Sequence, residues 1–297
     1  MKYIYSKEII VERKARLTEA VRELRACGIM PKLVAVVCSK DPAVASYVSV
    51  KKRHTEEVGG SFEVADLSAV GAYADVETRI KSLCGRADVH GVILVMSSKP
   101  EMDEIDLTNL IPARKDVDGL SATNLGALVQ NGPHQMFTAP ATPQACIFLA
   151  ASETEIKGKN VVVIGRGRTV GRPLANMLIS AGATVTVCHS GTRNIAQISR
   201  SAEIIFVATG RPHHFGREYF SDGQVIVDAG IGFIGGTLAG DVDVAALADL
   251  DVRVTPAPGG VGPLTSILIL ENLLKLIEIQ KRKDQAALGP QSSDGNE

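Results

Sequence analysis

Apolar residues occur along this chain in short runs rich in valine and isoleucine, separated by longer stretches with helical spacing. Continuously apolar runs indicate strands that are buried on both faces, as in parallel sheets covered by helices. The alternation therefore predicts an α/β fold. The runs expected to form strands are Leu33–Val37, Val92–Val95, Val161–Ile164, Thr184–Val187, Ile204–Ala208, Val225–Asp228 and Val252–Thr255.

A chain of 297 residues is long enough for two domains. The prolines of Ala139–Pro143 mark the expected boundary, which gives a first α/β domain over 1–139 and a nucleotide-binding domain over 140–265. A last helix, Ile267–Lys281 within segment 266–285, is expected to pack back on the first domain. The segment 286–297 is small, polar and interrupted by glycine and proline, so we expect it to be disordered.

A glycine-rich segment, Gly165–Gly171, directly follows the expected strand Val161–Ile164 and precedes a helical stretch that ends at Gly182. Strand, glycine turn and helix form the context of a dinucleotide site, in which Gly165 permits the tight turn and Gly167 lets the backbone approach a pyrophosphate. The third glycine, Gly171, comes one residue later than in G-x-G-x-x-G. A plain turn is the alternative interpretation of this segment.

The residues after the next expected strand bear on the choice of cofactor. An acidic residue there usually binds a free ribose 2′-hydroxyl, as in NAD. The segment Cys188–Arg193 contains no acid but includes Ser190, and Arg166 and Arg168 lie in the glycine turn. Hydroxyl and guanidinium groups suit a 2′-phosphate, so NADP is favoured over NAD. The alternative is that these arginines only face solvent.

A lysine interrupts an apolar helical stripe in the first domain. Tyr47 and Lys51 are four residues apart, so they lie on one face of the expected helix. A buried ammonium is costly unless it has a partner, which makes Lys51 a candidate functional residue. The alternative is a lysine whose head reaches solvent. Short-chain dehydrogenases also carry Tyr-x-x-x-Lys, but their glycine turn precedes the pair, so we reject that family. The stripe comprises Val44, Tyr47, Val48, Lys51, Thr55 and Val58.

Composition narrows the class of protein further. The net charge of −1 favours neither nucleic acid nor a membrane surface, and no tryptophan is present to stack on bases. Five scattered cysteines indicate free thiols in a reducing compartment, and the N-terminus carries no targeting signal, so we expect a cytoplasmic protein. No metal site is expected, because adjacent His213 and His214 do not converge on one ion.

Three prolines and three glycines crowd the segment Thr255–Thr265, where backbone of defined path can approach a ligand closely. A rigid loop before a helix is the alternative interpretation. Together with other segments, it resembles the bifunctional methylenetetrahydrofolate dehydrogenase/cyclohydrolase family over nearly the whole chain. The matching segments are Asp41-Pro-Ala, Ser46-Tyr-Val-x-x-Lys51, Lys115-Asp-Val-Asp-Gly119, Gly165-Arg-x-x-x-Val-Gly-x-Pro173, Cys188-His-Ser190 and Pro258-Gly-Gly-Val-Gly-Pro263.

The resemblance implies a catalytic domain and a Rossmann domain with a cleft between them, in a homodimer that oxidises methylenetetrahydrofolate with NADP. It implies that Tyr47 and Lys51 line the folate site and that Lys51 activates water or relays protons in the cyclohydrolase step. Asp118 would hold the pterin ring, and Pro258 and Gly259 would pass beside the folate. The cofactor would contact Gly165, Gly167, Gly171 and, by the family pattern, Arg166, Ser190, Thr142, Ile231 and Thr265.

Departures from the family pattern gather around Lys51. The family's glutamine that orients this lysine is Val95 here, and the segment that follows reads Met96-Ser-Ser-Lys-Pro100. Valine forms no side-chain hydrogen bond, so we expect a dehydrogenase with weak or absent cyclohydrolase activity. Two alternatives stay open: a degenerate protein that only binds folate or NADP, and an enzyme for another pterin or carbon–nitrogen substrate. Other departures are Ala141, Ala145 and Gly167.

Overall fold

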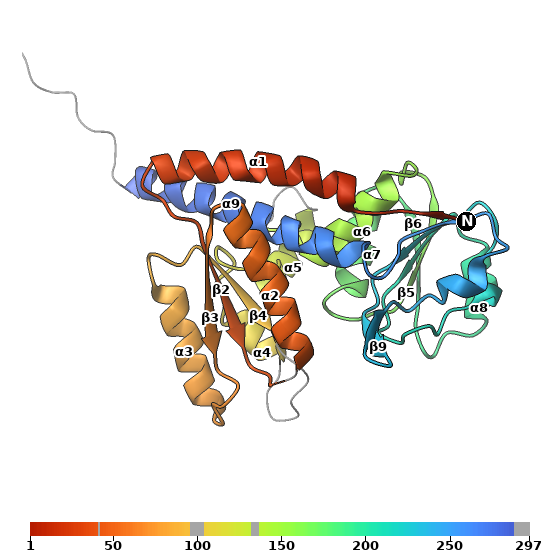
Figure 1. Cartoon of the computed structure of the whole chain (residues 1–297), viewed down its shortest axis with the longest axis horizontal. Coiled ribbons are helices and arrows are strands. Elements are labelled where there is room, and N and C mark those ends of the chain that lie inside the picture. The colour runs from red at the N-terminus through yellow and green to blue at the C-terminus, as the bar shows by residue number, and fades with distance from the viewer. Residues whose placement is uncertain (41, 96–103, 132–136, 288–297) are drawn as a thin grey trace, which may run out of the picture. The chain divides into compact units, whose positions relative to one another are not determined.

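A computed structural model of the chain describes residues 1–40, 42–95, 104–131 and 137–287 (Figure 1). These residues form two compact units, each assembled from segments that are distant in the sequence. The first unit comprises Met1–Leu17 and Asp118–Ile269, and the second comprises Thr18–Val117 and the chain from Leu270 onwards. The division thus lies at 117/118, whereas the composition of the sequence places a boundary at 139/140.

The first unit contains a six-stranded sheet whose neighbouring strands are all parallel, in the order β1-β11-β8-β7-β5-β6. Its strands are β1 (Lys2–Tyr3), β5 (Asn160–Ile164), β6 (Thr184–Cys188), β7 (Ile204–Val207), β8 (Val225–Asp228) and β11 (Arg253–Val254), with a separate hairpin of β9 (Gly232–Ile234) and β10 (Thr237–Ala239). Its helices are α5 (Ala122–Asn131), α6 (Ala141–Ala151), α7 (Gly171–Ser180) and α8 (Ile195–Arg200), with 3₁₀ turns at Arg217–Tyr219 and Val244–Leu247.

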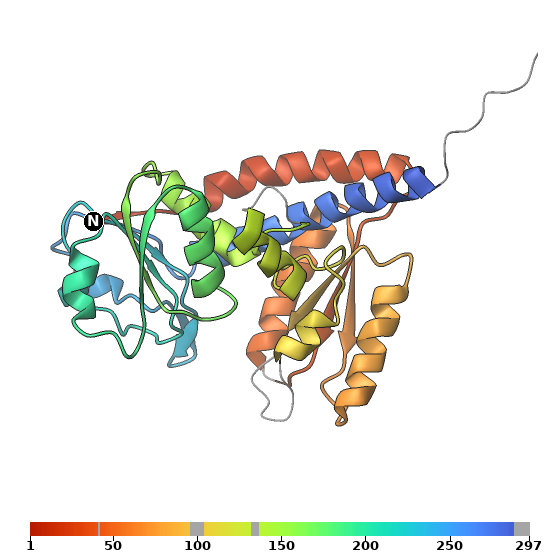
Figure 2. The ribbon, with the colours of Figure 1, turned by 180° about the vertical axis from the view of Figure 1, so that it is seen from behind.

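Alternate residues of β5 point to opposite faces of this sheet. Val162 and Ile164 belong to a core cluster with Phe220 and Val254, against which Ile195 of α8 packs. α7 contacts β5 and β6, and α6 contacts β8. Figure 2 shows these helices from behind the view of Figure 1. The central strands β5, β7 and β8 are therefore buried on both faces, as their continuously apolar runs predict.

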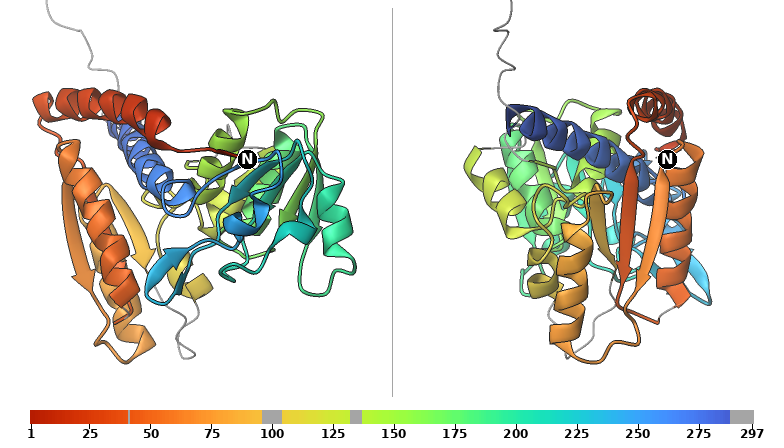
Figure 3. Two further views of the ribbon diagram at one scale, coloured as in Figure 1. Left: turned by 45° about the vertical axis from the view of Figure 1, so that its right-hand side comes forward. Right: turned by 90° about the vertical axis from the view of Figure 1, so that its left-hand side faces the viewer.

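The second unit contains a three-stranded parallel sheet in the order β3-β2-β4. On one face, Val34 and Val36 of the central strand pack with Val76 and Ile80 of α3. The right-hand panel of Figure 3 shows α2 and α3 on opposite faces of this sheet. Its elements are β2 (Lys32–Val37), α2 (Pro42–Glu57), β3 (Ser61–Asp66), α3 (Tyr73–Gly85), β4 (Gly91–Val95) and α4 (Glu104–Asn109), with parts of α1 (Lys7–Ala26) and α9 (Val261–Ala287).

The structure confirms the α/β fold and the seven expected strands, but the last helix begins at Val261, earlier than the expected Ile267. α6, α7 and α9 each have proline as their third residue: Pro143, Pro173 and Pro263. The first four amides of a helix have no partner within it, so proline there removes no hydrogen bond. α9 also extends to Ala287, two residues into the segment predicted to be disordered. The rest of that segment, Asp41 and residues 96–100 lie outside the described residues.

Candidate functional site

The glycine turn follows β5, the strand of the six-stranded sheet on either side of which the order of strands runs in opposite directions. β5 pairs with β6 on one side and with β7 on the other, so ligands of such sheets bind beyond the ends of these central strands. Gly165 follows β5 with φ of 116°, a conformation that L side chains rarely adopt. A Cβ atom at Gly165 would overlap the carbonyl oxygen of Ala208, which follows β7. Glycine is therefore required here by two separate constraints.

The third glycine closes the turn in spite of its irregular spacing. Gly171 is the first residue of α7, and a Cβ atom there would overlap the carbonyl oxygen of Gly165. The N–H group of Arg172 donates to the carbonyl oxygen of Gly167 at 3.0 Å. A Cβ atom at Gly167 would meet nothing within 4 Å. The backbone of Gly167 thus has open space beside the N-terminal end of α7, as a close approach to a phosphate group requires.

The loop after β6 is joined to the glycine turn and holds its own shape. The N–H group of Gly165 donates to the carbonyl oxygen of Cys188 at 2.9 Å. Within the loop, His189 N–H donates to Thr192 Oγ1 at 3.0 Å, and Thr192 N–H donates to the carbonyl oxygen of His189 at 2.8 Å. These bonds enclose the exposed Ser190 in a tight turn. The structure therefore brings Ser190 into the same corner of the first unit as Gly165.

Three further positions expected near the cofactor lie in the first unit. Thr142 is half-buried in the first turn of α6. Ile231 follows β8 and is 55% exposed, although it is apolar. Thr265 is buried in α9, where its hydroxyl group donates to the carbonyl oxygen of Val261 at 3.0 Å. Of the three, Ile231 has the side chain most open to a ligand.

Two buried carboxylates, Asp228 and Asp241, lie before and after Ile231 in the chain, and neither was predicted as a site residue. Asp228 accepts hydrogen bonds from the N–H groups of Gly230 at 2.9 Å and Val242 at 2.8 Å. Asp241 accepts bonds from Thr209 N–H, Thr209 Oγ1 and Gly210 N–H. A Cβ atom at Gly230 would overlap the Asp241 carboxylate. Both carboxylates therefore anchor the loops after β7 and β8. The sequence feature that could have indicated Asp228 is an acidic residue at the end of an apolar strand.

Burial raises the pKa of Asp228 to about 7, and the nearby charge of Asp241 acts in the same direction. An unfolded aspartate has a pKa near ~3.9. Between these values the folded chain holds a proton that the unfolded chain releases, so stability is greatest at low pH and falls as pH rises towards 7.

We therefore expect the free energy of unfolding, measured by urea titration at pH 5, 6, 7 and 8, to fall as the pH rises towards 7. Asp228 should contribute a fall of up to about 1.4 kcal/mol per pH unit between pH 5 and 6. Asp228→Asn should remove that contribution, because the amide does not titrate. An identical stability difference between the two proteins at pH 5 and pH 8 would contradict the raised pKa.

The proline- and glycine-rich segment is fixed by the start of the chain. The carbonyl oxygen of Gly259 accepts hydrogen bonds from the N–H group of Ser6 at 3.1 Å and from Ser6 Oγ at 2.9 Å. Gly259 has φ of 109°, and a Cβ atom there would lie 3.4 Å from the Tyr5 ring. Pro258 is exposed and follows a cis peptide bond. The segment is thus an anchored loop that presents Pro258 on its surface and leads into α9.

Asp118 is the first residue of the first unit after the chain leaves the second. It is half-buried, and its carbonyl oxygen accepts a hydrogen bond from the N–H group of Ala141 at 3.2 Å. Gly119 has φ of 69°, and a Cβ atom there would overlap the backbone of Ala139 and Pro140. The backbone on the C-terminal side of Asp118 is therefore held against the start of α6.

In the second unit, α2 buries Lys51 on the face that the sequence identifies. Lys51 is only 2% exposed, and its Nζ atom is buried 3.9 Å from the centroid of the Tyr47 ring. Val44, Val48 and Thr55 are buried on the same face. Tyr47 is the exception to the stripe, because it is 41% exposed and lies at its edge. An ammonium over an aromatic face is attracted by the ring, and more strongly when both are desolvated.

Val95 is the last residue of β4 and is buried, being 7% exposed. Its carbonyl oxygen accepts a hydrogen bond from Cys38 N–H at 3.0 Å, and it pairs with Val37 of β2. Its isopropyl group offers no hydrogen bond to any neighbour. The buried end of β4 therefore carries an apolar side chain at position 95.

Within the described parts of the chain, no group of three or more His, Cys, Asp and Glu side chains is placed to hold a metal ion. Among the same residues, no helix is both long and apolar enough to cross a membrane.

Comparison with known families finds a match for each half of the chain. Residues 4–118 match the model of the tetrahydrofolate dehydrogenase/cyclohydrolase catalytic domain. Residues 140–281 match the model of the NAD(P)-binding domain of the same family. The two matches have the order that the motifs indicate.

Similar proteins extend over nearly the whole chain. The bifunctional protein FolD of Thermotoga petrophila is 37% identical over 269 residues, which cover 90% of this chain and 95% of that protein. The structure of the bifunctional methylenetetrahydrofolate dehydrogenase/cyclohydrolase FolD of Campylobacter jejuni matches with a TM-score of 0.88 and 32% identity, over 94% of this chain and 99% of that one. The Trypanosoma brucei enzyme, solved with NADP and an inhibitor, has a TM-score of 0.87 and 30% identity, over 94% and 98% of the two chains.

Proposed function

Because this chain belongs to the tetrahydrofolate dehydrogenase/cyclohydrolase family, we propose that it oxidises 5,10-methylenetetrahydrofolate to 5,10-methenyltetrahydrofolate with NADP⁺. The observation that carries the proposal is the closed turn of Gly165 and Gly171 at the ends of β5 and β7, beside a loop that holds Ser190. Such a turn at such a position suits the pyrophosphate of a dinucleotide.

The oxidation needs little acid–base chemistry from the protein. NADP⁺, when bound, accepts the hydride that leaves the methylene bridge, and the lone pairs of the bridge nitrogens stabilise the cation that forms. The protein therefore contributes mainly orientation. We assign the pterin-binding role to Asp118, because a carboxylate can accept two parallel hydrogen bonds from an aminopyrimidine edge. Tyr47, Pro258 and Gly259 would complete the folate contacts.

Selection of NADP⁺ over NAD⁺ follows from the residues around the glycine turn. The exposed side chains of Arg166 and Ser190 offer a charge and a hydroxyl group to a 2′-phosphate, and the loop after β6 contains no acid that would repel it. Thr142, Ile231 and Thr265 would line the rest of the bound dinucleotide. Dehydrogenase assays with NAD⁺ in parallel check the preference, and an equal kcat/KM for both cofactors would contradict it.

The cyclohydrolase step adds water to the methenyl cation and opens the ring, which requires proton transfer. Lys51 is the residue that we assign to this transfer, since it is buried on α2 against Tyr47. At position 95, where the family pattern has a glutamine that orients the lysine, the valine side chain offers no hydrogen-bonding group. We therefore propose that methenyl hydrolysis is weak relative to hydride transfer.

Replacement of Val95 by glutamine should raise the rate of methenyl hydrolysis by about tenfold while changing NADP⁺ reduction by less than about twofold. The amide would give the lysine an oriented partner, which proton transfer needs and hydride transfer does not. Val95→Leu is the matched control, because it enlarges the side chain without adding a polar group. Equal rates of hydrolysis in both variants would show that Val95 is not the cause of weak activity.

Transfer of an isotope label tests the proposed hydride step itself. Substrate carrying deuterium on the methylene bridge should yield deuterated NADPH from the purified chain. Reduction of NADP⁺ without deuterium transfer would sink the assignment of the bridge as the hydride donor, and no reduction would leave a protein that binds but does not oxidise this folate.

The proposal includes a homodimer and a cytoplasmic location. Val187 on the edge strand β6 is 39% exposed, and an unpaired strand edge is a surface on which a second chain can pair. All five cysteines are free thiols, which is typical of proteins in reducing compartments. A sedimentation mass equal to one chain would contradict the dimer, and recovery outside the cytoplasmic fraction would contradict the location.

A further inference from the structure

Two side-chain amides of α9 hold the stretch of chain that leads to Asp118. Asn272 Nδ2 donates to the carbonyl oxygen of Val117 at 2.8 Å. Two turns further along the helix, Gln280 Nε2 donates to the carbonyl oxygens of Arg114 at 2.8 Å and His90 at 3.2 Å. A side-chain amide of α9 thus donates to a main-chain carbonyl group at Val117, directly before Asp118, and another does so at Arg114, four residues before Asp118.

The bond from Asn272 lies in a closely packed place. Asn272 is 5% exposed and Val117 is fully buried. A Cβ atom at Gly91, the first residue of β4, would overlap the side chains of Val117 and Leu273. The absence of a side chain at Gly91 therefore lets Val117 insert between β4 and α9, where Asn272 meets its carbonyl group.

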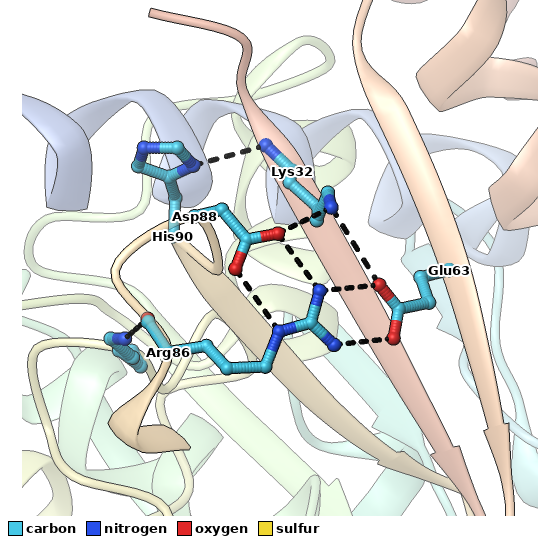
Figure 4. A network of polar contacts seen from close by, with 6 residues as sticks. Lys32, Glu63, Arg86, Asp88 and His90 are labelled. Carbon is cyan, nitrogen blue, oxygen red and sulfur yellow. Dashed lines mark hydrogen bonds and ion pairs between the residues drawn. The ribbon is translucent and has the colours of Figure 1, made fainter. Parts of the chain in front are cut away.

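The residues before Val117 are fixed from the sheet. Lys115 Nζ donates to the carbonyl oxygen of Arg86 at 2.7 Å, and the carbonyl oxygen of Lys115 accepts a bond from Val92 N–H at 2.7 Å. Arg86 is itself held by Glu63 at 2.7 and 2.9 Å and by Asp88, as Figure 4 shows. These bonds restrict movement of the chain before Asp118, and the bond from Asn272 adds a contact to the last peptide of this stretch.

We propose that Asn272 is a positioning residue that sets the orientation of Asp118 for substrate. The carbonyl group of Val117 and the nitrogen of Asp118 belong to one planar peptide, so a bond to that carbonyl fixes the plane on which Asp118 is carried. The following peptide is held by Ala141 N–H. The inference rests on the proposed role of Asp118 in folate binding.

Asn272→Leu and Gln280→Leu form a matched pair, because each removes one amide donor of α9 and replaces it with an apolar side chain. Asn272→Leu should raise the KM for 5,10-methylenetetrahydrofolate about tenfold and leave the KM for NADP⁺ within about twofold. Gln280→Leu should lower the melting temperature about as much as Asn272→Leu does, but it should leave both KM values within about twofold. If Asn272→Leu does not fold, Asn272→Ser replaces it, since serine cannot reach the Val117 carbonyl group.

If the amide of Asn272 only stabilised the fold, Asn272→Leu and Gln280→Leu would change the KM values for folate and for NADP⁺ to the same extent. Unchanged folate KM in the Asn272 variant, or an equal rise in the Gln280 variant, would overturn the positioning role. Asp118→Asn, measured in the same assay, distinguishes the substrate-binding role of Asp118 from the positioning role of Asn272. If it raises the folate KM and Asn272→Leu does not, only the positioning role fails; if it leaves the folate KM unchanged, the substrate role of Asp118 fails as well.

Discussion

Replacement of Asp118 by asparagine is expected to raise the KM for 5,10-methylenetetrahydrofolate by about 100-fold and to leave the KM for NADP⁺ nearly unchanged. The carboxylate can accept two hydrogen bonds from an aminopyrimidine edge, whereas an amide presents a donor where one acceptor is needed. A charge-assisted bond contributes about 1.5–3 kcal/mol, and the mismatched donor adds to the loss. The measurement is a steady-state titration of each substrate at saturation of the other.

The hydrogen bonds that hold the backbone at Asp118 do not depend on its carboxylate. The bonds from Asn272 to the Val117 carbonyl group and from Ala141 to the Asp118 carbonyl group both involve main-chain oxygens of the loop, which the substitution keeps. Asp118→Glu serves as the control for charge, and should recover part of the lost affinity because it restores two acceptors. A folate KM that does not change in Asp118→Asn would remove this residue from the substrate site.

Lys51→Met is expected to lower the rate of methenyl hydrolysis by at least about 100-fold while changing hydride transfer by only a few fold. Methionine keeps the length of the side chain and can pack against the Tyr47 ring, but it carries no proton. The lysine is 2% exposed on a face shared with Val44 and Val48, so its loss removes a buried charge rather than a solvated one. The hydrolysis of added methenyltetrahydrofolate and the reduction of NADP⁺ are measured separately.

The neighbouring lysine provides the control for this substitution. Lys52 lies in the same helix but is exposed, with its Nζ atom 3.8 Å from Glu56. An exposed ion pair of this kind contributes little to stability, so Lys52→Met should leave both rates unchanged. Should Lys51→Met lower hydrolysis no more than Lys52→Met does, Lys51 takes no part in the proton transfer.

Most of the strands that the sequence predicts are buried on both faces, and the exception is β6, an edge strand with exposed residues. Every residue of β7 is buried, and its run Ile204–Val207 is continuously apolar. β3 was missed because Ser61–Asp66 is an edge strand that alternates polar and apolar residues and is half-exposed. β1 was missed because two residues carry too short a pattern. Composition thus predicts buried strands most readily, although β6 shows that burial of both faces is not required.

The sequence also predicts which residues form the glycine turn, but it does not show why they must be glycine. Gly165 is constrained by the carbonyl oxygen of Ala208, which lies after another strand. Asp228 and Asp241 were missed for a similar reason, since they are buried by loops that meet only in the folded chain. Lys51 was found because helical periodicity is local, and its apolar neighbours are one or two turns away.

Incubation of the purified chain with 5,10-methylenetetrahydrofolate and NADP⁺ tests the proposed dehydrogenase activity most directly. NADPH and methenyltetrahydrofolate are followed together by absorbance. We expect NADPH to form while methenyltetrahydrofolate accumulates, because the proposed hydride transfer does not depend on position 95, whereas Val95 offers Lys51 no orienting hydrogen bond. NADPH without accumulation would contradict the impaired hydrolysis, and reduction of neither NADP⁺ nor NAD⁺ would contradict the dehydrogenase itself.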